Sequence, residues 1–157
     1  MTEVHPTPRL DRRQFATGAA GLVLFALSTG RLGAQVPEPA WQQLLKNLVG
    51  DSKPIEGKLT LELPEIAENG NTVPLTVSVE SPMTANDYVK AIHVIATENP
   101  QPGVATFRFS PLSGKASAAT RMRLARTQEV IGLAELSDGK FLLGRRTVKV
   151  TIGGCGG

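Results

Sequence analysis

The sequence predicts an all-β domain, an immunoglobulin-like antiparallel β-sandwich with one short helix before it. Three observations support this fold class. Apolar residues recur at every second position in about seven short segments, turn-forming residues separate these segments, and helical crossovers between them are missing. Without such crossovers a parallel α/β sheet is excluded, whereas a closed barrel remains an alternative.

The helix is expected near the start of the domain, at residues 39–49. Pro39 stands at its beginning, and apolar side chains follow at helical spacing at Trp41, Leu44, Leu45 and Leu48. Gly50 marks the end of the helix, because glycine is favoured just past helix C-termini. We interpret Trp41 as an anchor in the core or at an interface rather than as a platform for a substrate.

The strands are expected where hydrophobicity alternates with a period of two. This pattern marks five segments, 59–63, 73–79, 107–109, 122–124 and 148–152. Residues 88–96 are apolar on both faces, as expected of a central strand, and 129–136 are a further candidate. Asn, Asp, Gly, Ser and Pro indicate turns at 68–71, 99–103, 113–114 and 137–140.

The last predicted strand leads directly into the C-terminus. Its alternation points three side chains into the core, those of Val148, Val150 and Ile152. The same alternation leaves on the outside Arg145, Thr147, Lys149 and Thr151. We therefore expect burial in the core to anchor the base of the five residues that follow.

The chain ends in Gly153-Gly154-Cys155-Gly156-Gly157, and Cys155 is its only cysteine. An internal disulfide is therefore impossible, and the glycines give this tail little bulk and few preferred conformations. Fully extended, five residues reach roughly 16–18 Å, at about 3.3–3.6 Å each. We predict that 153–157 form a flexible arm, which brings the nucleophile Cys155 into the active sites of other proteins.

Residues 1–34 have the layout of a secretory signal peptide. Arg12 and Arg13, followed by Phe15, are typical of the twin-arginine type, and an apolar run extends from Ala16 to Gly30. This run is too short and too rich in Ala and Gly for a membrane span of about 20 residues. We expect cleavage after Ala34 and export to the periplasm by the twin-arginine route. An uncleaved anchor or a chance Arg-Arg pair is the alternative.

Export leaves one domain, at 35–152, followed by the arm. The whole chain has 17 Lys and Arg against 14 Asp and Glu, a formal net charge of +3. Without residues 1–34 the numbers are 13 and 12, a net charge of +1, so nucleic acid is not an expected partner. An odd cysteine in an oxidising compartment indicates intermolecular pairing or a reactive thiol.

Six basic residues are expected near the arm: Arg121, Arg123, Arg126, Arg145, Arg146 and Lys149. Two interpretations are open. We favour the first, in which they keep the faces of the strands soluble. In the second they attract anionic adducts or acidic partner surfaces.

The sequence shows no catalytic machinery. His93, the only histidine after residue 34, lies mid-strand among apolar neighbours and is interpreted as structural. One Cys and one His cannot supply a zinc site, so neither a metal nor another cofactor is predicted. Catalytic triads, Cys-His pairs and phosphate-binding loops are missing. Three acidic residues look like solvated strand and turn positions, Glu129, Glu135 and Asp138. A thiol without such machinery favours a carrier over an enzyme.

Together these features resemble the SoxY family, the sulfur-carrier subunits of the Sox thiosulfate-oxidising system. The specific part is the terminal Gly-Gly-Cys-Gly-Gly, which accompanies a twin-arginine signal and an Ig-like domain. Weaker support comes from the stretches 66–70, 81–84, 98–100, 120–125 and 137–139. The resemblance spans essentially the whole mature chain.

The resemblance implies that Cys155 holds thiosulfate-derived sulfur covalently, as an S-thiosulfonate or a persulfide. A c-type haem protein would load it, a hydrolase would release sulfate, and a sulfane dehydrogenase would oxidise the remaining sulfur. It also implies a heterodimer with a SoxZ-like subunit that has no export signal of its own and that would be exported together with this chain. The arm carries no cation that would favour the thiolate, so we expect activation in the visited enzyme's pocket.

Two other classes of protein remain as alternatives. One is a cytosolic sulfur carrier that is activated as a thiocarboxylate on its terminal Gly-Gly, and the other is a structural Ig-like module that dimerises through its cysteine. Export argues against the first class. The position of added sulfur, on Cys155 or on the terminal carboxylate, separates the alternatives.

Overall fold

The computed structural model describes residues 37–153. The predicted signal peptide at 1–34, with Arg12, Arg13 and Phe15, lies outside these residues, and so do Gly154, Cys155, Gly156 and Gly157. The described residues from Glu38 onward belong to one structural unit. Its elements are α1 (Ala40–Val49), β1 (Ile55–Glu56), β2 (Leu59–Glu62), β3 (Ile66–Ala67), β4 (Val73–Val79), β5 (Val89–Ala96), β6 (Gly103–Arg108), the 3-10 turn η1 (Pro111–Ser113), β7 (Ala116–Met122), β8 (Gln128–Leu136) and β9 (Phe141–Val150).

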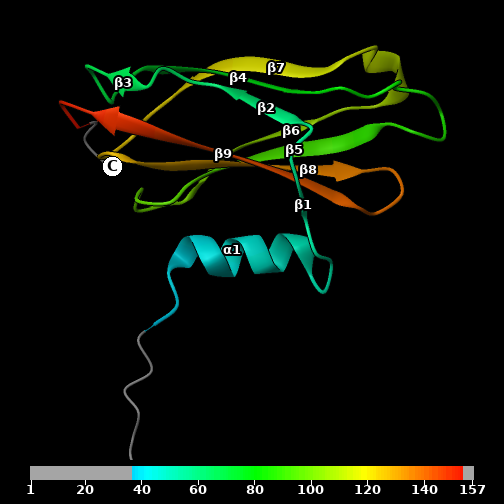
Figure 1. Ribbon diagram of the computed structural model, residues 1–157, viewed down its shortest axis with the longest axis horizontal. Coiled ribbons are helices and arrows are strands. Elements are labelled where there is room, and N and C mark those ends of the chain that lie inside the picture. The colour runs from blue at the N-terminus through cyan, green and yellow to red at the C-terminus, as the bar shows by residue number, and fades with distance from the viewer. Residues whose placement is uncertain (1–36, 154–157) are drawn as a thin grey trace, which may run out of the picture. The chain divides into compact units, whose positions relative to one another are not determined.

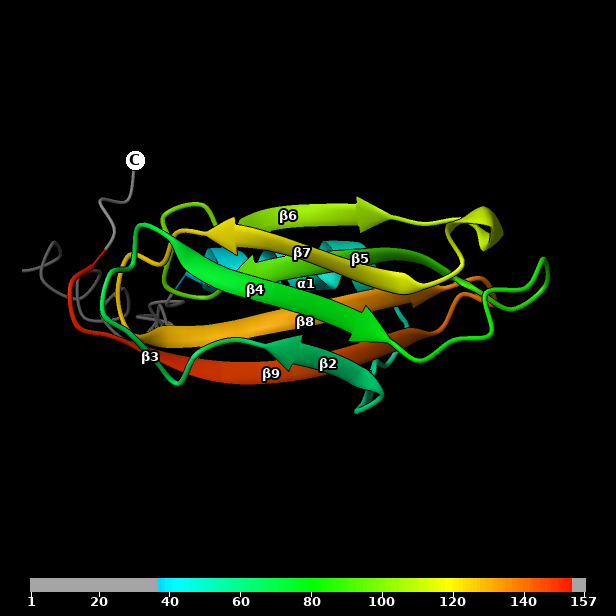
Figure 2. The same cartoon turned by 90° about the horizontal axis from the view of Figure 1, so that it is seen from above.

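The strands form two sheets that pack face to face (Figure 1). The larger sheet has the order β1-β9-β8-β5-β6, with β3 also pairing with β9, and the smaller has the order β2-β4-β7. Figure 2 shows the smaller sheet lying over the larger one. The predicted immunoglobulin-like sandwich is confirmed. All pairings within it are antiparallel except those of the short strands β1 and β3 with β9, which are parallel.

The main core lies between the two sheets. In β4 the side chains alternate strictly, and every second one is buried, at Val73, Leu75, Val77 and Val79. Opposite them the larger sheet contributes Ile92, Val94, Val130 and Val148, each at most 1% exposed. This period of two is what the sequence pattern predicts, because successive side chains of a strand point to opposite faces.

Helix α1 covers the outer face of the larger sheet (Figure 1). Five buried residues of the sheet form this second cluster, Ile95, Ile131, Leu133, Phe141 and Leu143. The helix packs on them with Trp41, Leu44, Leu45, Leu48 and Val49, all partly buried. The predicted helix, its end at Gly50 and the packing role of Trp41 are therefore confirmed. Burial on both faces also explains why most positions of β5 and β8 are apolar.

Two glycines let β2 approach the larger sheet closely. Gly132 of β8 and Gly144 of β9 are partners in register, and Leu59 of β2 lies over both. A Cβ atom at Gly132 would lie 2.7 Å from Cδ2 of Leu59, and one at Gly144 would lie 2.8 Å from its backbone oxygen. At Gly144 the contact is with backbone, so glycine is required there for space, whereas at Gly132 a side chain would displace the end of Leu59.

The structure differs from the sequence prediction in β1, β3 and the bounds of three other strands. The predicted segments 107–109 and 122–124 overlap only the last residues of β6 and β7, and β9 is longer than predicted. Strands of two residues, such as β1 and β3, are too short to show alternation. Strand β9 begins at Phe141, seven residues before the predicted start at 148. Its first half is apolar on both faces because one face meets the smaller sheet and the other meets α1.

The inward orientation predicted for Ile152 is wrong. Val148 is fully buried and Val150 is partly buried, as expected, but Ile152 is 68% exposed. Strand β9 ends at Val150, and the backbone then bends at Thr151 and Ile152. The alternation of a strand therefore no longer applies there.

None of the helices in residues 37–153 is long and apolar enough to cross a membrane.

Candidate functional site

The candidate site is the end of the sandwich at which the chain leaves β9 and continues toward Cys155 (Figure 2). Three loops surround this point, residues 68–72, 97–102 and 123–127. We call residues Thr151–Gly153 the root of the C-terminal segment. The predicted arm residues Gly154, Cys155, Gly156 and Gly157 lie beyond the described residues, so the structure places the root and not the thiol.

The first loop holds one side of the root. The backbone N–H of Thr151 donates to the carbonyl of Ala67 (3.1 Å), and its hydroxyl donates to the carbonyl of Glu68 (3.0 Å). One residue further on, the carbonyl of Ile152 accepts a hydrogen bond from the N–H of Gly70 (2.8 Å). The root therefore keeps backbone partners after β9 has ended.

The third loop holds the other side. The hydroxyl of Thr127 accepts from the N–H of Val150 (2.9 Å) and donates to the carbonyl of the same residue (3.4 Å). Gly153 then passes against the carbonyl of Ala125, so closely that a Cβ atom on Gly153 would lie 2.3 Å from that oxygen. Glycine is therefore required at position 153, because the chain passes close to the loop. The sequence predicts Gly153 only as part of the flexible arm.

Two amide side chains fix the loop that carries Ala125. Asn99 accepts through Oδ1 from the N–H of Ala125 (2.9 Å) and donates through Nδ2 to the carbonyl of Arg123 (2.9 Å). Gln128, which is only 4% exposed, donates through Nε2 to the same Oδ1 (2.9 Å) and to the carbonyl of Arg126 (3.1 Å). Its Oε1 accepts from the N–H of Glu98 (2.8 Å), so the second and third loops are joined.

Sequence reasoning missed Asn99, Thr127 and Gln128 as residues of this site. A signal was present in Asn99-Pro100, because Asn often bonds to nearby backbone in turns. For Gln128, a polar residue at an inward position of a strand was a weaker sign. Nothing in the sequence indicated that these side chains converge on the loop beside Gly153.

Two of the six basic residues that are expected near the arm form ion pairs, and a third donates to a hydroxyl group. Arg145 pairs with Glu129 (2.8 Å) and lies 3.6 Å from Glu56, while Arg146 lies 3.5 Å from Glu65. Arg121 donates to the hydroxyl of Thr72. The acidic side chains between these arginines agree with the interpretation that we favoured, in which they keep the strand faces soluble.

His93 lies on the outer face of the larger sheet, beside α1. Its Nδ1 is 3.0 Å from the hydroxyl of Thr106, and its ring borders a groove of about 320 Å³ that is also lined by Leu44 and Leu48 of the helix. Burial is the main cause that lowers the pKa of His93 below its ordinary value, and Arg108 lowers it further, against the opposing effect of Glu135. The structural interpretation of His93 agrees with this environment.

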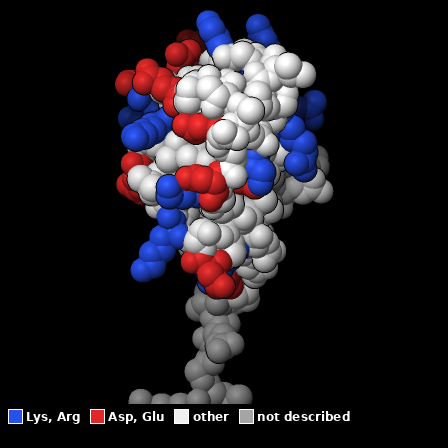
Figure 3. Space-filling view, turned by 90° about the vertical axis from the view of Figure 1, so that its right-hand side faces the viewer, with Lys and Arg blue, Asp and Glu red and all other residues white. Residues whose placement is uncertain are grey.

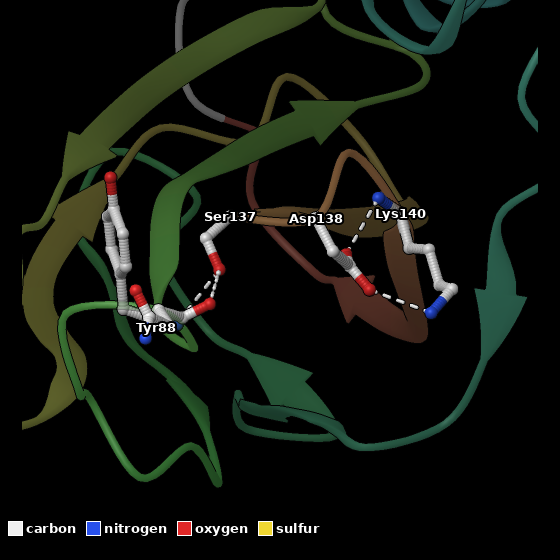
Figure 4. Close-up of polar contacts among 5 residues, drawn as sticks. Tyr88, Ser137, Asp138 and Lys140 are labelled. Atoms are coloured by element: carbon white, nitrogen blue, oxygen red, sulfur yellow. Dashed lines mark hydrogen bonds and ion pairs between the residues drawn. The ribbon is translucent and has the colours of Figure 1, made fainter.

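The end of the sandwich away from the root is held by a turn (Figure 4). Ser137 accepts from the N–H of Tyr88 (3.1 Å) and donates to the carbonyl of Asn86 (3.2 Å). Asp138 accepts from the N–H of Lys140 (3.0 Å) and pairs with its ammonium group (2.7 Å), which lowers the pKa of the Asp138 carboxyl. These contacts fix the β8–β9 turn and offer no reactive arrangement.

Charge on this far end is mixed. Figure 3 shows basic and acidic side chains interspersed among uncharged ones. Glu135, near the end of β8, pairs with Lys90 of β5 (2.6 Å). Glu129, Glu135 and Asp138 are thus each engaged with a cation. Within residues 37–153 no three His, Cys, Asp or Glu side chains are grouped as a metal site requires.

Comparison with solved structures finds the same fold. The chain is similar to the sulfur carrier protein SoxY from Chlorobium limicola f thiosulfatophilum, with 31% identity, a TM-score of 0.60 and coverage of 71% of this chain and 96% of that one.

It is also similar to a superoxide reductase (neelaredoxin) from Ignicoccus hospitalis, with 17% identity, a TM-score of 0.54 and coverage of 60% and 80%. A superoxide reductase from Nanoarchaeum equitans is 9% identical, with a TM-score of 0.52 and coverage of 61% of this chain and 100% of that one. At these identities the two reductases show the fold alone.

No curated protein matches the chain. Among protein families, the one described as sulfur oxidation protein SoxY matches residues 45–155. This match covers most of the chain, from within α1 through the sandwich to the cysteine. It agrees with the resemblance predicted from the terminal residues and with the SoxY structure from Chlorobium limicola. The chain therefore belongs to the SoxY family of sulfur-oxidation proteins.

Proposed function

We propose that this protein is a sulfur carrier, which holds thiosulfate-derived sulfur covalently on Cys155 and presents it to the enzymes of thiosulfate oxidation. One observation carries the proposal: the SoxY match extends to residue 155, and the residue there is the only cysteine of the chain. The similar protein from Chlorobium limicola is itself named a sulfur carrier.

The sandwich supports this role by giving the reactive residue a fixed base. The root is bonded to the loops on both sides, and only two peptide bonds separate Gly153 from Cys155. A carrier needs such a base because a partner enzyme must find the cargo at a predictable place. The protein itself contributes attachment and presentation, and the partners contribute catalysis.

The chemistry of the cycle requires partners that supply an oxidant and water. In loading, the sulfur of Cys155 forms an S–S bond with the outer sulfur of thiosulfate, the thiol proton goes to solvent, and two electrons pass to a c-type haem protein. A hydrolase then uses one water to release sulfate and leaves a persulfide on Cys155. A sulfane dehydrogenase then oxidises the outer sulfur of that persulfide to a sulfonate, with three oxygen atoms from water and transfer of its electrons to an external acceptor. Hydrolysis of this S-sulfonate releases a second sulfate and regenerates the Cys155 thiol. Because glycines flank Cys155, backbone of small cross-section can enter each enzyme's pocket.

We further propose that the protein works in the periplasm, as a heterodimer with a SoxZ-like subunit. The predicted twin-arginine signal, with Arg12, Arg13 and Phe15, supports export, and this route accepts folded proteins. Replacing Arg12 and Arg13 together by Lys should leave both subunits in the cytoplasm. Cell fractionation tests this, and a SoxZ-like subunit found outside the cytoplasm in that variant would contradict joint export.

Intact-mass analysis of protein from thiosulfate-grown cells tests the carrier function. We expect additions of whole sulfur atoms or of a thiosulfate unit, located on Cys155 by fragmentation. Cys155→Ser should abolish these additions and thiosulfate oxidation without changing the melting temperature. Leu112→Ser is the matched control, because the Leu112 side chain is 98% exposed and lies outside both the core and the root. Sulfur on the terminal carboxylate, or only a disulfide dimer, would refute the proposal.

A further inference from the structure

The segment that leads to Cys155 is held beyond the end of β9, as far as Gly153. Backbone hydrogen bonds join Thr151 and Ile152 to residues 67–70, and Gly153 lies against the carbonyl of Ala125. The carbonyl of Ala125 therefore limits the positions that Gly153 can take. The position of this carbonyl decides where the chain leaves the sandwich.

The position of the Ala125 carbonyl depends on Asn99. Its Oδ1 accepts from the N–H of Ala125 itself and from Nε2 of Gln128, and its Nδ2 donates to the carbonyl of Arg123. A single side chain thus joins both ends of the 123–128 segment. Buried Gln128 completes the connection by bonding to the carbonyl of Arg126 and the N–H of Glu98.

We propose that Asn99 is a positioning residue for Cys155. By holding Ala125, it fixes the carbonyl against which Gly153 lies. It thereby also fixes the point from which the sulfur-bearing residue extends. This inference rests on the proposed carrier function, since a fixed starting point matters only if Cys155 must reach other proteins.

Covalent geometry makes the starting point decisive. Consecutive Cα atoms are about 3.8 Å apart, so the Cα of Cys155 lies within about 7.6 Å of the Cα of Gly153 in any conformation. A partner must therefore bring its active site to this end of the sandwich. If the root came loose, the tether would lengthen and the effective concentration of the cargo at a docked enzyme would fall.

A distance measurement on the root tests the first half of the proposal. The test uses the full chain with nitroxide labels attached at Lys115→Cys and Ile152→Cys, and with Cys155→Ser so that no third label attaches. The two labels span the sandwich from the exposed loop before β7 to the root. Pulsed electron resonance should give one narrow distance. Asn99→Ala and Gly153→Ala should each replace it by a broad or shifted distribution.

Two further variants serve as controls. Asn99→Asp keeps the oxygen acceptor for Ala125 and Gln128 but loses the donor to the carbonyl of Arg123, so it should restore the narrow distance only in part. Asn86→Ala, in a loop at the opposite end, should not change the distance. If Asn99→Ala does not fold, Gly153→Ala decides, because its added methyl group meets only the loop beside the root. A narrow, unshifted distance in both variants would overturn the proposal.

A second readout separates positioning from stability. With Cys155 present, Asn99→Ala and Gly153→Ala should lower thiosulfate consumption in cells, while alkylation of the purified protein by iodoacetamide keeps its rate, because a small reagent needs no docking. Asn99→Asp, which keeps only the acceptor half of the contact, should restore consumption in part. Sulfur on Cys155 with unchanged consumption in both variants would refute the positioning role alone. An absence of sulfur on wild-type Cys155 would refute the proposed function.

Discussion

Single glycine residues serve two different purposes in this chain. Gly144 and Gly153 are required because the backbone of another segment lies where a Cβ atom would be. Gly139, in the β8–β9 turn, is required because its φ of +83° is rarely adopted by residues with a side chain. The sequence shows the same letter in both cases, and only the contacts distinguish them.

Gly144→Ala should destabilise the fold by about 1–3 kcal/mol, the usual cost of overpacking a core. The added methyl group would meet the backbone oxygen of Leu59, which cannot move without shifting β2. Gly103→Ala is the matched control, because its nearest neighbour is the end of the flexible Leu44 side chain, at 3.3 Å. Urea unfolding of both variants measures the difference. Equal losses would contradict the proposed close approach.

His93 should make stability depend on pH. Burial lowers its pKa below the ordinary value of 6.5, so the unfolded chain binds a proton at this ring at higher pH than the folded chain does. The free energy of unfolding should therefore fall as pH decreases through about 6.5 toward the folded pKa. In His93→Gln this component should be missing. Melting temperatures of both proteins between pH 8 and pH 5 test it, and parallel curves would show that His93 does not contribute.

Helix α1 is the element whose stability depends most on tertiary contacts. It has ten residues, fewer than an isolated helix needs to be stable in water, and Pro39 before it makes no side-chain cap. Its apolar side chains are only partly buried, but they cover the second cluster on the larger sheet. We therefore expect α1 to depend on the sheet, and the sheet to depend less on α1.

Leu45→Asp should release α1 while the sandwich stays folded. Placing a carboxylate against Ile131 and Leu133 removes apolar burial worth about 1–2 kcal/mol for a partly buried Leu and adds a cost of desolvation. Gln43→Asp, on the exposed side of the same helix, is the control. Hydrogen exchange should increase in residues 40–49 and stay slow in β5 and β8. Protected amides in the helix of Leu45→Asp would disprove this division.

For the molecule as a whole, positive and negative charge nearly balance. Lys and Arg side chains contact Glu or Asp in six ion pairs among the described residues, and the formal charge after residue 34 is only +1. Such a surface gives little long-range attraction toward either sign of partner. Recognition of partners should therefore depend on shape at the root end more than on net charge.

Replacing Arg145 and Arg146 by Gln should change the association rate with a SoxZ-like partner only slightly at low salt. Acidic residues lie beside both arginines, so this surface is of mixed charge and is not expected to steer an acidic partner. Stopped-flow or surface-based kinetics at several salt concentrations test this. A steep decrease in the on-rate that disappears at high salt would instead support attraction by a basic surface.

The sequence by itself determined the sandwich fold class, the helix with its end at Gly50, the positions of β2, β4, β5 and β8, and the SoxY resemblance. These features follow from local periodicity, turn residues and a terminal motif, all of which lie in short stretches. Only the tertiary structure decided that Ile152 turns outward, that β1 and β3 pair with β9, and that Asn99 and Gln128 hold the loop beside Gly153. These depend on contacts between segments distant in the chain, which leave no periodic trace in the sequence.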